Sequence, residues 1–99
     1  MRYTLLVIAS FGNKAADDVW ERKHVRRLGP EIQRAAHRKL LILDAAVTIN
    51  DLRVPLGNRL EKLAGDRAGQ HSIRINDQWR VCFTWTPAGP DNVELTDYH

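Results

Sequence analysis

Two short alternating segments separated by a polar turn constrain the fold more than any other part of the chain. Apolar side chains occupy every second position, at Ile73 and Ile75 before the turn and at Trp79 and Val81 after it. Because successive side chains of a strand point to opposite faces, this pattern predicts a β-hairpin with one apolar face. Pairing Ile75 with Trp79 keeps the apolar groups on the same side.

This register also fixes two arginines on the other face of the hairpin. Arg74 and Arg80 are equally distant from Asp77, and pairing Ile73 with Val81 places them directly opposite each other. A slip by one residue would mix the two faces, which burial of one face forbids. The turn then has three residues centred on Asp77, and Arg80 is expected outside the core. Opposed like charges are tolerated where water or an anion lies between them, so this face suits either solvent or a phosphate-rich partner.

The length of 99 residues predicts one domain, residues 1–99, with a single core. Cys82 is the only cysteine, so it forms no internal disulfide, and its strand context predicts a buried small apolar side chain. The chain has no run long enough to span a membrane, and the apolar run within its first ten residues is too short for a signal peptide. These features favour a cytoplasmic protein without membrane association.

The distribution of charge narrows the class of partner. The net charge is +3 and the pI is near 9.4, with most of the basic residues between Lys14 and Arg80 and no Lys or Arg in the last 19 residues. A basic body is typical of nucleic-acid binders and of proteins with an acidic partner. Composition alone does not distinguish between these two classes of partner.

The first half of the chain predicts a strand followed by two helices. Residues 5–11 form an apolar run that ends at a glycine, and Asn13 can cap a helix that ends near 23–24. Gly29-Pro30 opens a second helix. Its buried stripe is formed by Ile32, Ala36, Leu40 and Leu43.

The second half predicts strands. A long connection at 44–58 is expected to pack down or to carry function. A short strand around 59–63, the hairpin, a turn at 87–92 and a last strand from Val93 follow. Helices followed by strands favour an α+β domain, with the helices on one face of a mainly antiparallel sheet of about three to five strands.

Several runs, in order, resemble the HigB toxins of the RelE superfamily, also called proteic killer or plasmid maintenance system killer proteins. These runs are 26–34, 51–63, 65–67, 72–80 and the closing Asp97-Tyr98-His99. The resemblance covers about Ile8 to His99, so residues 1–7 are expected to be an extension without a function of their own.

The resemblance implies a RelE-like microbial RNase fold and the toxin role in a type II toxin–antitoxin system. HigB-like toxins are ribosome-dependent endoribonucleases that cut mRNA in the A site of the 30S subunit and inhibit translation. It also implies a HigA-type helix-turn-helix antitoxin as a partner, together with the ribosome, its rRNA and mRNA. The reaction needs no metal and no cofactor, and His24, His37, His71 and His99 show no metal-ligand spacing.

The closing triplet supplies candidate catalytic groups. Cleavage through the RNA 2′-hydroxyl needs proton transfer and stabilisation of a charged phosphorane. The imidazole of His99 can transfer protons near neutral pH, Tyr98 can stack on a base, and Asp97 can orient His99 or an arginine. The alternative interpretations are that His99 belongs to a frayed tail and that Tyr98 and Asp97 are ordinary strand residues. All three line one site only if the last strand bends near Thr96, and we expect that bend.

Four further side chains complete the predicted site. Arg80 matches the family's active-site arginine and is the predicted phosphorane stabiliser, with Arg74 as a phosphate clamp. Arg67 either touches RNA or forms a turn pair with Asp66. Glu61 stands where some relatives place a functional histidine, so it is either the general base or a solvated strand residue.

A basic set on the helices resembles an rRNA-docking surface, with a solvated helix face as its alternative. Its members are Arg26, Arg27, Arg34 and Arg38, with Lys23 and Lys39. Two other functions stay open at this point. One is a non-catalytic, ParE-like gyrase poison, and the other is an inactive relic that only binds its antitoxin.

Overall fold

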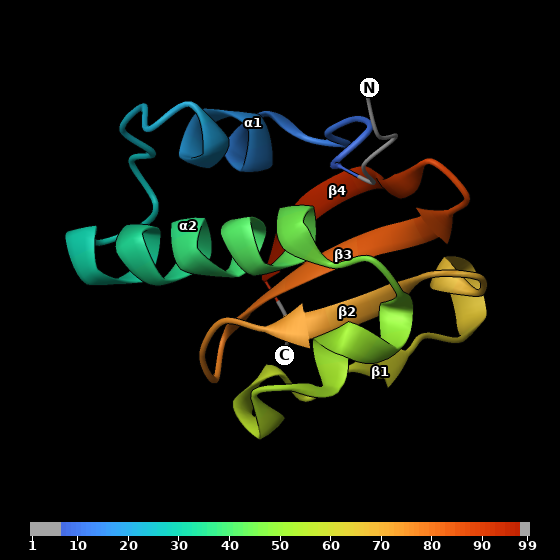
Figure 1. Ribbon diagram of the computed structural model, residues 1–99. Helices are drawn as coiled ribbons and strands as arrows, with labels where there is room; N and C mark the ends of the chain where they lie inside the picture. Colours follow the sequence, from blue (N-terminus) through green and yellow to red (C-terminus); the bar gives the residue numbers. More distant parts are fainter. Residues whose placement is uncertain (1–6, 98–99) are drawn as a thin grey trace.

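A computed structural model describes residues 7–97 as two helices packed on one face of a four-stranded antiparallel sheet (Figure 1). The helices are α1 (Lys14–Trp20) and α2 (Pro30–Ala45); the strands are β1 (Glu61–Lys62), β2 (His71–Arg74), β3 (Trp79–Thr86) and β4 (Gly89–Asp97), in the order β1-β2-β3-β4. Three 3-10 turns are η1 (Ile49–Arg53), η2 (Leu56–Asn58) and η3 (Gly65–Arg67). The predicted α+β class is confirmed.

Helix α1 begins where the sequence predicts and ends earlier. The Asn13 side chain accepts a hydrogen bond from the Ala16 N–H at 3.1 Å, as expected of an N-cap. The helix stops at Trp20 because Arg22 adopts a left-handed conformation, with φ of 60°. The Lys23 N–H then closes back onto the Asp18 carbonyl at 2.7 Å, which ends the helix before 23–24.

Helix α2 carries the predicted apolar stripe. Pro30 occupies its first turn, Ala36, Leu40 and Leu43 are fully buried, and Ile32 is half-buried. These side chains pack on the helix-facing side of the sheet. The sheet contributes Ile73, Trp79, Val81, Phe83, Val93 and Leu95 to the same core.

The hairpin has the predicted register. Ile73 pairs with Val81 and Arg74 with Arg80, and the Ile75 N–H donates to the Trp79 carbonyl at 2.9 Å. Burial of the apolar face against the helices decides the pairing, because a shift by one residue would expose all of these side chains.

The predicted N-terminal strand is wrong for most of its described part. Residues 5–6 of this strand lie outside the described residues. Of the expected extension, residues 1–7, the structure describes only Val7. Residues 7–11 run beside β4 and form only a single parallel bridge, between Phe11 and Val93. The Ala9 N–H donates to the Pro90 carbonyl at 2.7 Å, and the Val93 N–H donates to the Ser10 carbonyl at 3.0 Å. The segment therefore covers the edge of β4 without becoming a regular strand.

Strand β4 begins at Gly89, four residues before the predicted start at Val93, and the turn shrinks to Pro87-Ala88. The Thr86 hydroxyl closes this turn by donating to the Gly89 carbonyl at 2.8 Å. Gly89 has φ of 118°, and a Cβ there would lie 2.3 Å from the Val7 carbonyl oxygen. Glycine permits both the conformation and the close approach, so a residue predicted as loop belongs to the strand.

The 44–58 connection packs down, as predicted. Leu52 and Asn58 are fully buried, and the Asn58 side-chain amide donates to the Leu52 carbonyl at 3.2 Å. Lys39 donates to the side-chain Oδ1 of Asn58 at 2.5 Å, so this lysine turns toward the loop instead of joining an exposed basic face.

Cys82 is buried within β3, as predicted. Across residues 7–97, no helix combines the length and the apolar character needed to cross a bilayer.

The environment of His71 indicates how the stability of the protein depends on pH. Its ring stacks on Phe83 with centroids 6.3 Å apart, and its buried Nδ1 has no hydrogen-bond partner within residues 7–97. Burial lowers the pKa of His71, and the positive charges of Lys62 and Arg53 lower it further. The folded protein therefore favours the neutral His71 ring. The stability that the neutral ring contributes is complete above the pKa of histidine in the unfolded chain, about 6.5. It is lost as the pH falls through the lower pKa of His71 in the folded protein.

We therefore expect urea unfolding to show lower stability at pH 5.5 than at pH 7.5. A His71→Phe variant, which keeps an aromatic ring against Phe83, is expected to lose less stability over the same interval. An identical loss in both proteins would contradict this assignment.

Candidate functional site

Arg80 lies at the centre of the candidate site and is buried, with 6% of its surface exposed. As predicted, it projects from the face of the sheet that the helices do not cover. It lies outside the hydrophobic core, as expected, but it is not exposed, because the chain around η2 and β1 packs over it. Its Nε donates to the Ser72 Oγ at 2.7 Å, and one terminal nitrogen donates to the Arg59 carbonyl at 2.6 Å. These two bonds fix the plane of the guanidinium.

The Arg59 carbonyl points at Arg80 because Arg59 ends η2 in a left-handed conformation, with φ of 44° and ψ of 58°. Two residues later, the Glu61 carboxylate lies 3.1 Å from a terminal nitrogen of Arg80. The Glu61 side chain is 52% exposed, whereas that of Arg80 is nearly inaccessible. The pair therefore joins a buried cation to a carboxylate that solvent or a ligand can reach.

A cavity of about 480 Å³ opens beside this pair. Its lining residues are Arg59, Leu60, Glu61, Arg74, Asn76, Asp77 and Arg80. Arg74 is ion-paired with the exposed carboxylate of Asp77. Guanidinium groups outnumber carboxylates in this lining, so the cavity favours an anionic ligand.

The structure does not bring Asp97 to this cavity. Strand β4 stays paired to its described end, with Thr96 opposite Arg80 and Asp97 opposite Trp79. The bend expected near Thr96 is therefore absent, and Asp97 lies on the Trp79 side of the sheet, where it accepts a hydrogen bond from Gln78 at 3.1 Å. Tyr98 and His99 lie outside the described residues.

Arg67 is engaged within the protein. It donates to Gln70 at 2.9 Å and forms an ion pair with Glu94 at 3.1 Å. The hydrogen bond to Glu94 raises the pKa of Arg67. The turn pair with Asp66 was one of the two alternatives, but Arg67 pairs instead with Glu94, which joins η3 to β4, and it does not line the cavity.

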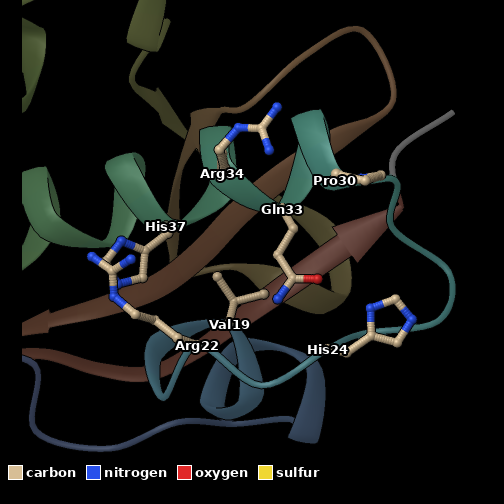
Figure 2. A pocket seen from close by; sticks show the side chains of 7 residues that line it. All are labelled: Val19, Arg22, His24, Pro30, Gln33, Arg34 and His37. Atoms are coloured by element: carbon tan, nitrogen blue, oxygen red, sulfur yellow. The ribbon is translucent and has the colours of Figure 1, made fainter.

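The predicted basic set is not confined to the helices, because Lys23, Arg26 and Arg27 lie in the connection between α1 and α2. Arg26, Arg27, Arg34 and Arg38 are exposed, but Arg27 stacks over the Trp79 ring at 5.4 Å from its centroid. Arg34 instead lines a second cavity, between α1 and α2 (Figure 2).

Sequence reasoning missed two parts of the site. Ser72 is fully buried and lies on the same face as Arg80, a position that the alternation of the hairpin already implies. The Arg59 carbonyl carries no signal in the sequence, because its role depends on a backbone conformation. Within residues 7–97, no three His, Cys, Asp or Glu side chains gather as a metal site.

The fold is that of a RelE-like toxin. Residues 9–99 match the family model described as the RelE-like toxin of type II toxin-antitoxin system HigB. The chain is 44% identical over 89 residues to Toxin HigB-1 of Vibrio cholerae, covering 89% of this chain and 90% of that protein. It is 38% identical over 58 residues to an uncharacterized protein of Haemophilus influenzae, covering 59% of this chain and 57% of that protein.

The chain therefore belongs to the HigB family, the toxins of type II toxin–antitoxin systems. Membership of such a system implies that an antitoxin is its partner.

Proposed function

We propose that this chain is a ribosome-dependent endoribonuclease that cuts mRNA in the A site without a metal ion. The observation that supports the proposal most is the fixed guanidinium of Arg80, held by Ser72 and Arg59 beside Glu61 at an anion-favouring cavity. A cation already held in place needs no reorganisation when charge develops on the phosphorane.

In the proposed reaction, the RNA 2′-oxygen attacks the adjacent phosphorus. The 2′-O–P bond forms and the P–O5′ bond breaks, leaving a 2′,3′-cyclic phosphate and a 5′-hydroxyl. The Glu61 carboxylate takes the proton of the 2′-hydroxyl, and the protonated imidazole of His99 gives its proton to the leaving 5′-oxygen and becomes neutral. Half of the Glu61 side chain is accessible, so a substrate in the cavity can reach it. Tyr98 stacks on a base in this scheme.

The other groups of the cavity hold the RNA backbone. Arg74 clamps a phosphate, which competes with the exposed carboxylate of Asp77 for its guanidinium. Exposed Arg26 and Arg38 extend the positive surface toward rRNA, so ribosome binding weakens steeply with salt. Asp97 and Arg67 are left out of the proposed catalytic and RNA-binding sets because neither lines the cavity. A HigA-type helix-turn-helix protein is the proposed antitoxin, and the cytoplasm is the proposed location.

Mapping of mRNA 5′ ends after induced expression tests the proposal. We expect the wild-type chain to arrest growth and to create new 5′ ends within translated reading frames. His99→Ala is expected to abolish both effects, because it removes the proposed acid. His24→Ala, which removes an exposed histidine that does not line the Arg80 cavity, is the matched control and is expected to cut as the wild type does.

Two results would contradict the proposal. Growth arrest with intact transcripts and gyrase trapped on DNA would favour the ParE-like alternative. No growth arrest in the absence of antitoxin would favour a chain that only binds its antitoxin.

A further inference from the structure

The cavity beside Arg80 contains two carboxylates, and each of them already pairs with an arginine. Glu61 lies 3.1 Å from a terminal nitrogen of Arg80, and Asp77 pairs with Arg74. The third arginine of the lining, Arg59, forms no salt bridge in the part of the chain that the structure describes. Of the three positive charges that favour an anionic ligand, two are therefore balanced by side chains of the protein itself.

The carboxylate of Asp77 is not required by the fold. The Asp77 side chain is 99% exposed, and that of its partner Arg74 is 32% exposed. Among residues 7–97, Arg74 is the only hydrogen-bond partner of the Asp77 carboxylate. Exposed ion pairs of this kind add little to stability. Stability therefore does not explain why a carboxylate lies at the mouth of an anion-favouring cavity.

The turn that carries Asp77 is closed without its side chain. The Asn76 Oδ1 accepts hydrogen bonds from the Gln78 N–H at 2.9 Å and from the Trp79 N–H at 2.7 Å. The Asn76 N–H also donates to the Trp79 carbonyl at 3.2 Å. These bonds form an Asx turn, which fixes the backbone on both sides of Asp77. The turn thus holds the carboxylate within reach of Arg74.

A carboxylate in this position weakens the binding of a phosphate in two ways. A phosphate that reaches Arg74 must displace the Asp77 carboxylate, and the same negative charge repels it while both lie in the cavity. RNA that diffuses freely meets this cost in full. mRNA that a ribosome holds beside the toxin is present at a high effective concentration, so a several-fold loss of intrinsic affinity has little effect on its binding.

We propose that Asp77 is a specificity-determining residue, whose carboxylate occupies Arg74 and so disfavours free single-stranded RNA relative to RNA held by the ribosome. The inference rests on the proposed function, because it takes ribosome-bound mRNA as the substrate. It adds a cause for the dependence on the ribosome that lies within the cavity itself, namely competition between a carboxylate and a phosphate for one guanidinium.

The affinity of the protein for free RNA tests this role. The probe is a short single-stranded RNA with 2′-O-methyl groups, which cannot be cut through its 2′-oxygens, and fluorescence anisotropy measures its binding. Asp77→Asn is expected to raise the affinity about fivefold at low salt, the upper end for an exposed ion pair. Because one more phosphate contact forms, the slope of log K against log salt is expected to become steeper by about 0.7.

Three comparisons separate this effect from a change of net charge. Asp66→Asn makes the same change at an exposed side chain that does not line the cavity, and is expected to raise the affinity less than about twofold. In an Arg74→Gln background, Asp77→Asn is expected to give no larger gain than Asp66→Asn, because no guanidinium is left to release. For ribosomes programmed with the methylated RNA, the gain from Asp77→Asn is expected to be smaller than for free RNA.

Equal gains in Asp77→Asn and Asp66→Asn would overturn the proposal, because they would show only an effect of net charge. A gain that persists without Arg74 would also overturn it, as would an equal gain for free RNA and for programmed ribosomes. None of these measurements depends on RNA cleavage. Intact transcripts after induced expression would contradict the proposed cleavage, whereas the binding outcomes named here would contradict only the role of Asp77.

Discussion

Replacing Arg80 with methionine is expected to abolish mRNA cleavage and to destabilise the protein at the same time. Methionine keeps the length of the side chain but carries no charge and no N–H donors. Loss of a fixed donor to a developing oxyanion typically lowers the rate about 100- to 1,000-fold. The Ser72 hydroxyl and the Arg59 carbonyl also lose a donor in a buried environment, at a cost of about 1–3 kcal/mol for each unsatisfied group.

Single-turnover cleavage on mRNA-programmed ribosomes and urea unfolding together check both halves of this expectation. The cleavage assay is run at a temperature at which the variant is folded by circular dichroism, so that lost chemistry is separated from lost structure. Arg53→Met, at an exposed arginine of η1, is the matched control and should cut at the wild-type rate. Cleavage by Arg80→Met within about tenfold of wild type would remove Arg80 from the proposed mechanism.

The pairing of the hairpin could be predicted from the sequence, and the burial of Arg80 could not. Alternation of Ile73, Ile75, Trp79 and Val81 fixes both the face and the register, because any slip exposes the apolar set. Burial of Arg80 depends on the segment around β1, which pairs for only two residues and has no periodicity of its own. The alternation of apolar and polar residues in a strand does not show whether a segment distant in the sequence packs over its polar face.

The wrong start of β4 has a compositional cause, because glycine, proline and asparagine at 87–92 indicate a loop. The strand absorbs most of them, because Gly89 supplies the conformation and close approach that the chain needs there. At the other end, the expected bend at Thr96 had no local signal of its own. The ladder continues instead, and Asp97 falls on the Trp79 side of the sheet as strict alternation requires.

Backbone conformation explains what else the sequence could not show about the two cavities. The Arg59 carbonyl orients Arg80, and Arg22 turns the chain at the cavity between the helices. Both residues have positive φ values, which are uncommon for arginine and therefore not expected from the residue type. Arg74 and Arg80 were predictable because they alternate along the hairpin.

Replacing Trp79 with alanine is expected to have the largest effect on stability that follows from the core. Trp79 is 3% exposed and packs on the helix-facing side of the sheet, under the Arg27 guanidinium. Deleting a buried aromatic side chain costs about 3–5 kcal/mol, while domains of this kind unfold with only about 5–15 kcal/mol in total. Urea unfolding should therefore show a greatly reduced free energy of unfolding.

Two companion variants separate the packing of the ring from its contact with the arginine. Trp79→Phe keeps most of the buried surface and is expected to recover much of the stability that alanine loses. Arg27→Ala removes only the stacked cation and is expected to cost about 0.5–1 kcal/mol. A soluble Trp79→Ala protein as stable as the wild type would contradict the placement of this ring in the core, and with it the pairing that sets Arg74 opposite Arg80. The site depends on that pairing, because it carries Arg80 to the face where Ser72, Arg59 and Glu61 hold it.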